Sequence, residues 1–142
     1  MKHIIDTAWK GKMKFEVEVD GHSIVMDATQ EAGGEDAGPR PKKLMLVALA
    51  GCTGMDVVSI LKKMHVDIEY FNVIVEGDVT EEHPKHYEKM HIIYKFKGKK
   101  LYPDKLMKAV EMSQDRYCGV SAAYKKAMEV THELGGLGYV FW

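Results

Sequence analysis

The sequence predicts an α+β fold in which antiparallel sheets pack around a long central helix. Segments with the two-residue alternation of β-strands gather in residues 1–29 and 67–97, and the segments with helical spacing form blocks of their own. Strands and helices segregated in this way are typical of α+β proteins with antiparallel sheets. The chain has 142 residues, of which 46% are hydrophobic, so we expect one domain with a substantial core.

Residues 1–29 are expected to form a β-meander. Residues 12–20 alternate between apolar and polar side chains, which is the period of a half-buried strand. The apolar face comprises Met13, Phe15, Val17 and Val19. Asp20 and Gly21 then predict a two-residue hairpin turn before a return strand at residues 23–26.

A long apolar helix is predicted over residues 42–64, after a loop at residues 30–41 that is rich in glycine and proline. Proline is tolerated in the first turn of a helix, which suits Pro41 as its start. The run 44–55 is apolar on nearly every helical face and should be buried all round. It is too short for a membrane span of roughly 20 residues. One sheet hardly covers such a helix, which favours a homodimer.

Residues 67–134 are predicted to fold as two strands followed by two helices. The alternation of Phe71, Val73 and Val75 marks the inner face of the first strand. The predicted strands cover residues 67–80 and 86–97, and the predicted helices cover residues 103–114 and 120–133. The tail, residues 135–142, ends in apolar side chains that should pack against another surface.

Charge and composition exclude several classes of protein. The formal net charge is −1, with 20 Lys and Arg against 21 Asp and Glu, so a nucleic-acid binder with a basic excess is not expected. The first nine residues lack the apolar region of a signal peptide, which predicts a cytoplasmic protein without a membrane partner.

Cys52 and Cys118 are the two cysteines of the chain, and they lie 118 − 52 = 66 residues apart. In the cytoplasm a cysteine pair is more often catalytic or redox-sensing than a structural disulfide. The ordinary interpretation is that both are small buried hydrophobic residues. If a helix begins near Gly119, its free N–H groups should favour the thiolate of Cys118.

A reactive Cys52 requires a nearby positive charge, because a free thiol has a pKa of about 8.5 and burial opposes its ionisation further. Arg40 and Lys43, on the N-terminal side of the helix, are candidates for this cation, and Arg116 is a candidate neighbour of Cys118. Asp56 follows Cys52 by one helical turn and, on a buried helix, needs a partner, for which we expect a helix cap or a lysine of a second subunit.

Two segments together resemble the OsmC/Ohr superfamily, and its YhfA-like branch more than its Ohr branch. They read GPRPKKLMLVALAGCTGMDVVSIL at residues 38–61 and RYCGVSAAYKKAMEVTHEL at residues 116–134. The resemblance implies an intertwined α+β homodimer that reduces organic hydroperoxides, with Cys52 as peroxidatic and Cys118 as resolving cysteine. The chain departs from the family pattern where Lys43 replaces an expected Glu and where no Arg precedes Arg40.

Three functions follow as hypotheses. The first is a thiol peroxidase that needs no cofactor, forms a Cys52–Cys118 disulfide and is recycled by an external dithiol. The alternative is a non-catalytic OsmC-like dimer that binds an apolar small molecule in its inter-subunit cleft. The third is a metal site at His83, His86 and His91; a solvated hairpin tip is the better interpretation of these residues, and no metal is expected.

Overall fold

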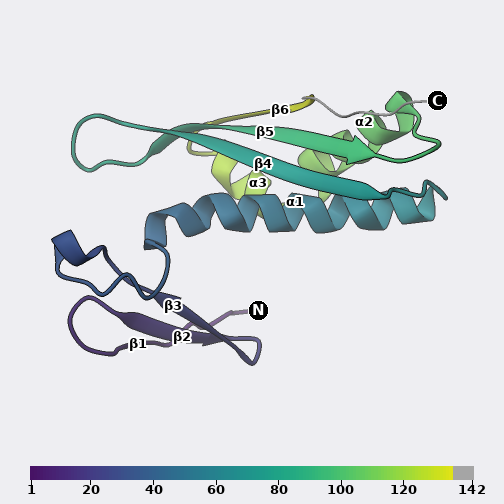
Figure 1. The fold of residues 1–142 in the computed structure, drawn as a ribbon. Helices are drawn as coiled ribbons and strands as arrows, with labels where there is room; N and C mark the ends of the chain where they lie inside the picture. Colours follow the sequence, from purple (N-terminus) through teal and green to yellow (C-terminus); the bar gives the residue numbers. More distant parts are fainter. Residues whose placement is uncertain (136–142) are drawn as a thin grey trace. The chain divides into compact units, whose positions relative to one another are not determined.

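The computed structural model describes residues 1–135, which form two compact units. The first unit comprises Met1–Met45 and the second begins at Leu46. Figure 1 shows the fold coloured along the chain. The organisation of the whole chain as one domain stays a prediction, and the expected packing of the apolar tail lies outside the described residues, beyond position 135.

The first unit contains the predicted meander. Its strands β1 (Thr7–Trp9), β2 (Phe15–Val19) and β3 (His22–Met26) form an antiparallel sheet in that order. Val19 pairs with His22 across a turn in which Asp20 and Gly21 have φ of +52° and +80°. Two positive φ angles are what a type I′ hairpin turn requires, so the hairpin prediction is confirmed.

The loop after β3 wraps around the buried carboxylate of Asp27. Its Oδ1 accepts a hydrogen bond of 2.8 Å from the Ala28 N–H, and its Oδ2 accepts bonds of 3.1 Å from the N–H groups of Glu35 and Ala37. The 3₁₀ turn η1 (Gln30–Ala32) lies within this loop. The glycines and prolines of the sequence predicted this loop at residues 30–41. Its conformation is stabilised by the carboxylate of Asp27, which precedes it.

The central helix α1 (Leu44–Lys63) follows a 3₁₀ turn, η2 (Pro41–Lys43), so Pro41 does open the helical segment. The side chains buried along α1 are Leu49, Thr53, Val57 and Leu61. On the opposite side Val47 and Met55 are 62% and 77% exposed. The expectation of burial all round was therefore wrong for a single chain, because the sheet covers one side of α1 only.

Pro41–Lys63 is long and apolar enough to cross a membrane by length and composition, so the expectation that it is too short does not hold for the whole helix. Its buried side, however, includes Thr53, whose hydroxyl is hydrogen-bonded to Tyr94 and Ser113 of the same unit. These contacts are those of the core helix of a soluble fold.

The second unit packs helices on one face of a three-stranded sheet (Figure 1). The strands are β4 (Tyr70–Val79), β5 (Tyr87–Lys97) and β6 (Glu129–Leu134), with β5 in the centre. The inner face of β5 is fully or almost fully buried and carries Tyr87, Met90, Ile92, Tyr94 and Phe96. Phe71 of β4 stacks on Phe96 with ring centroids 4.5 Å apart, which confirms the predicted inner face of β4.

Helix α2 (Pro103–Met112) lies where the sequence predicted it and buries Leu106, Ala109 and Val110. The chain then makes a π-helical turn, Ser113–Tyr117, before the short helix α3 (Gly119–Lys125). A π-turn of this kind is frequent at functional sites.

The helix predicted over residues 120–133 was wrong in its second half. Helix α3 ends at Lys125, and β6 pairs with β5 in parallel, so this sheet is not purely antiparallel as expected. The alternation in EVTHEL carried the strand signal: Val130, His132 and Leu134 are half-buried, whereas the side chains between them are exposed. Residues 120–127 have helical apolar spacing, and the period changes to that of a strand at Glu129, which the prediction of a single helix did not take into account.

Candidate thiol site

The fold brings the two cysteines together. The Sγ atoms of Cys52 and Cys118 and a carboxylate oxygen of Asp56 all lie within 4.8 Å of one another. Cys52 and Asp56 are half-buried, whereas Cys118 is 2% exposed. The two cysteines are free thiols and form no disulfide in the structure. Residues separated by 66 positions thus share one small site at the side of α1.

Local backbone geometry places each sulfur. Cys52 and Asp56 stand one turn apart on α1, so their side chains lie on the same stripe of the helix. Cys118 is the residue before α3 and has an extended backbone, with φ −75° and ψ 102°. Its N–H donates to the Ser113 carbonyl at 2.7 Å, which closes the π-turn and directs the side chain back toward α1.

A buried polar network supports the site from the side of the core. Thr53 Oγ1 shares hydrogen bonds with Tyr94 OH at 2.6 Å and Ser113 Oγ at 2.8 Å, and it accepts one from Gln114 Nε2 at 3.2 Å. Ser113 Oγ lies 2.9 Å from Asp56 Oδ2 and donates to it. Ser121 Oγ donates to Gln114 Oε1 at 2.6 Å. The network links α1, β5, the π-turn and α3.

Burial decides the ionisation of Cys118. Desolvation and the neighbouring Cys52 raise the pKa of the Cys118 thiol from 9.0 to about 11, although the Ser121 N–H donates to its Sγ at 3.3 Å. The sequence correctly placed Cys118 at a helix start. The expectation that this position favours the thiolate was wrong, because desolvation outweighs the donor.

Of the three cations expected near the thiols, Arg40 and Arg116 have other contacts. Arg40 pairs with Asp36 at 2.7 Å and donates to the Gly38 carbonyl at 2.8 Å, within the first unit. Lys43 is exposed in η2, and the Arg116 guanidinium lies 5.6 Å from the centre of the Tyr117 ring. Within residues 1–135, no lysine or arginine forms an ion pair with Asp56.

Sequence reasoning missed most of the residues that support the site. Asp56 was expected to meet a helix cap or a lysine of a second subunit. Within the chain it accepts a hydrogen bond from Ser113, and the lysine of a second subunit stays a prediction. The spacing of Cys52 and Asp56 on one helix was a usable signal. Nothing in the sequence indicated that Thr53, Ser113 and Gln114 would meet, because they lie on elements joined only by the tertiary fold.

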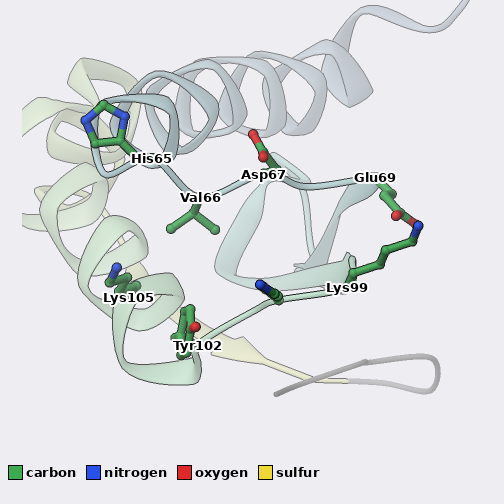
Figure 2. A pocket seen from close by; sticks show the side chains of 8 residues that line it. His65, Val66, Asp67, Glu69, Lys99, Tyr102 and Lys105 are labelled. Carbon is green, nitrogen blue, oxygen red and sulfur yellow. The ribbon is translucent and has the colours of Figure 1, made fainter.

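Cavities lie along α1 and beyond its C-terminal end. The first, of about 510 Å³, begins at Asp56 and continues along the helix; it is lined by Asp56, Ser59, Ile60, Lys63, Met64, Met112 and Tyr117. It gives an open approach to the site from the C-terminal half of α1. The second, of about 530 Å³, lies beyond the end of α1, where Figure 2 shows His65, Asp67 and Lys99 around it. No cysteine lines either cavity, but the first includes Asp56 of the thiol site and the second includes none of its three residues, so only the first adjoins the site.

The three histidines considered for a metal site do not share one partner. The His86 ring Nδ1 contacts the Pro84 carbonyl at 2.7 Å in the β4–β5 turn. His91 lies on β5, where Nδ1 contacts Thr131 Oγ1 at 2.6 Å and Nε2 contacts Glu133 Oε1 at 2.9 Å. His91 therefore joins β5 to β6 across the outer face of the sheet.

The sequence of this chain is similar to those of known proteins. The family described as OsmC-like protein matches residues 33–133. Protein YhfA of Escherichia coli strain K12 is 32% identical over 112 residues, which cover 79% of this chain and 81% of YhfA.

Solved structures share the fold over nearly the whole chain. A hypothetical protein from Aquifex aeolicus VF5 superposes with a TM-score of 0.81 and 27% identity, covering 99% of each chain. An organic hydroperoxide resistance protein OsmC from Legionella pneumophila superposes with a TM-score of 0.68 over 94% of this chain and 98% of its own. At 17% identity, the second likeness concerns the fold alone.

Proposed function

This chain belongs to the OsmC-like family, and on that premise we propose that it reduces organic hydroperoxides through Cys52 and Cys118. The observation that supports the proposal is the approach of the two sulfurs to within 4.8 Å. A disulfide has an S–S length of about 2.05 Å, so side-chain rotation and a small backbone movement must close the remaining gap. Within the shared fold, the protein from Legionella pneumophila is an organic hydroperoxide resistance protein, and we take the proposed substrate class from it.

The proposed cycle has three balanced steps. The Cys52 thiolate, whose proton Asp56 has accepted, attacks the terminal oxygen of the hydroperoxide, and the O–O bond breaks. Cys52 becomes a sulfenic acid, and the leaving alkoxide takes that proton from Asp56 and departs as the alcohol. The Cys118 thiol then attacks the Cys52 sulfur, forms the disulfide and releases water. An external dithiol exchanges with this disulfide, becomes oxidised itself and restores both thiols.

The different exposure of the two thiols supports their roles. Cys52 is half-buried, and Asp56, one helical turn away, lines a cavity, so a substrate can approach Cys52 more easily than the buried Cys118. Asp56 is the carboxylate within reach of both sulfurs. We assign it as the acceptor of the Cys52 proton, in the place of the family's Glu, which this chain lacks at Lys43.

A homodimer is the proposed assembly, in the cytoplasm. The uncovered side of α1 forms an apolar groove of about 540 Å³ with β4, lined by Gly51, Gly54, Met55, Val58, Ser59, Lys62, Phe71 and Val73. Exposed apolar area of this kind marks an interaction surface. A second copy of α1 would cover it and give the helix the burial on all sides that its sequence indicates.

The test is disulfide formation in the reduced protein after addition of cumene hydroperoxide. Intact mass spectrometry should record the loss of two hydrogen atoms, and peptide mapping should place the bond between Cys52 and Cys118. Cys52→Ser should abolish consumption of the hydroperoxide. Cys118→Ser should consume one equivalent and stop at a sulfenic acid that dimedone traps. A wild-type protein that stays reduced under excess hydroperoxide contradicts the proposal.

A second candidate is a non-catalytic dimer that binds an apolar molecule. It is favoured by the apolar groove on α1 and by the absence, within residues 1–135, of an ion pair between a cation and Asp56 beside the thiols. It predicts that both thiols stay reduced under excess cumene hydroperoxide. It also predicts that binding of an apolar fluorophore is unchanged in Cys52→Ser.

A further inference from the structure

We propose that Cys52, Cys118 and Asp56 form a site for a thiophilic divalent cation, of which Zn²⁺ is the type case, in the reduced protein. The two Sγ atoms and one carboxylate oxygen of Asp56 lie within 4.8 Å of one another. Around tetrahedral zinc, two sulfur ligands at about 2.3 Å from the metal are separated by roughly 3.8 Å. Small side-chain rotations would therefore bring the three donor atoms to ligand distance of one ion.

The surroundings of the three groups suit an ion with one open coordination position. Cys118 is buried, whereas Cys52 and Asp56 are half-buried, and Asp56 lines the cavity along α1. Three protein ligands with a fourth position open to water are the arrangement of reactive zinc sites. The described residues supply no fourth ligand of the His, Cys, Asp or Glu type to this cluster, so water would complete the shell.

Hydrogen bonds to the proposed ligands come from the residues behind them. Ser113 Oγ donates to Asp56 Oδ2 at 2.9 Å, and in residues 1–135 no hydrogen bond reaches the second oxygen, Oδ1. The Ser121 N–H donates to Cys118 Sγ at 3.3 Å. Contacts of this kind fix the orientation of carboxylate and thiolate ligands in metal sites. The carboxylate is thus oriented with one oxygen left for an ion.

The donor set selects the class of metal. Two thiolates favour soft or borderline cations such as Zn²⁺, Cd²⁺ and Co²⁺ over Mg²⁺ and Ca²⁺, which prefer oxygen ligands. Binding replaces the two thiol protons, which are released to solvent. It also places a positive charge beside Asp56, which has no ion-pair partner in the part of the chain that the structure describes.

A consequence for redox chemistry rests on the proposed function. A sulfur bound to the ion has its electron pair engaged and is a poorer nucleophile toward the O–O bond. A disulfide leaves no thiolate to bind the ion. Metal binding and oxidation are therefore mutually exclusive, and Zn²⁺ would hold the pair in its reduced, inactive form until a chelator or a competing protein removes it.

The direct experiment is titration of the reduced, metal-free protein with Co²⁺ and Zn²⁺ under argon. Co²⁺ should produce a thiolate-to-metal charge-transfer band and the visible bands of a tetrahedral site, and one equivalent of Zn²⁺ should abolish them. Cys52→Ser and Cys118→Ser should each lose the charge-transfer intensity of one sulfur. Asp56→Asn keeps both thiols and the side-chain size, and should weaken Zn²⁺ binding at least about tenfold in competition with a chromophoric chelator.

Surface histidines bind Zn²⁺ weakly, so the double variant His83→Ala/His86→Ala is the matched control. It should leave the charge-transfer band and the high-affinity equivalent of Zn²⁺ unchanged. The proposal is overturned if Co²⁺ gives no charge-transfer band in the reduced wild type, or if the histidine variant loses the tight site while Asp56→Asn retains it.

The failures of the two proposals give different results. A protein that forms the disulfide with cumene hydroperoxide at the same rate with and without Zn²⁺, and shows no Co²⁺ band, retains the proposed function and refutes the metal site. A protein that binds Co²⁺ through both sulfurs but stays reduced under hydroperoxide retains the metal site and refutes the peroxidase. If both hold, one equivalent of Zn²⁺ should slow disulfide formation at least about tenfold, and EDTA should restore it.

Discussion

Thr53 is the residue that ties the thiol site to the core. It follows Cys52 in the chain and is fully buried. Its single hydroxyl contacts Tyr94, Ser113 and Gln114. Within residues 1–135, every buried side-chain N or O atom has a hydrogen-bond partner. A satisfied buried network of this kind holds its members in one arrangement. The position of Ser113, and through it the orientation of Asp56, therefore depends on Thr53.

Replacing Thr53 by Val should destabilise the protein by about 1–3 kcal/mol, because an isosteric methyl removes a hydrogen bond from each of three buried partners. The measurement is the free energy of unfolding in urea. Thr7→Val, at an exposed position of β1, is the control and should change stability by less than about 0.5 kcal/mol. Equal effects of the two substitutions would contradict the assigned role of Thr53.

The thiol of Cys118 should ionise at unusually high pH. In the Cys52→Ser variant, burial still raises the pKa of Cys118 above 9.0, toward the value of about 11 in the wild type. At neutral pH the thiolate fraction should then be about ten- to a hundredfold smaller than in an unfolded control. The check is the pH profile of alkylation by iodoacetamide, which should continue to rise above pH 9.0 in the folded protein and level off near it in urea.

At the scale of elements, two segments are held by contacts that local sequence does not reveal. The loop after β3 is organised by Asp27, whose carboxylate accepts three backbone N–H groups. Burial opposes the ionisation of Asp27, but those donors and the charge of Lys14 outweigh it and hold the pKa of the carboxyl below 3.8. In the second unit, β6 is held by the parallel pairing with β5 and by the His91 contacts.

The contribution of Asp27 to stability should depend on pH. Because its folded pKa is lowered, the contribution is complete above the unfolded value of 3.8 and is lost as the pH falls through the folded pKa. Asp27→Asn should therefore lower the unfolding midpoint clearly at neutral pH and less at the most acid pH where the protein stays folded. Asp6→Asn, an exposed acid of the same unit, is the control. A difference between Asp27→Asn and wild type that grows on acidification would contradict this assignment.

At the scale of the whole molecule, the exposed apolar side of α1 remains to be covered. Val47, Met55 and Val58 are 62%, 77% and 46% exposed in one chain. Side chains on the opposite face of the same helix are completely or almost completely buried. In the homodimer proposed above, another copy of the chain would cover this side, bringing the same helix to the same surface as two-fold symmetry requires.

Met55→Glu should therefore shift the protein toward the monomer. An unpaired charge buried in an interface costs several kcal/mol, and a factor of ten in the dissociation constant corresponds to about 1.4 kcal/mol, so we expect at least about a hundredfold weaker association. Sedimentation equilibrium measures it. Tyr102→Glu places the same charge on a side chain that is 46% exposed at the start of α2, and should leave the dimer unchanged. A wild type that is monomeric at all concentrations refutes the dimer.

The amino-acid sequence by itself determined the features that depend on periodicity and local chemistry. These are the meander with its Asp20–Gly21 turn, the helix that follows Pro41, the β4–β5 hairpin and α2, since each is encoded by neighbouring residues. The family also followed from the sequence, because its motifs are contiguous runs. The tertiary structure decided the rest: the strand β6, the burial of Cys118, and the meeting of Cys52, Cys118 and Asp56. Contacts between residues far apart in the chain fix these features, and desolvation acts on a thiol only once such contacts have formed.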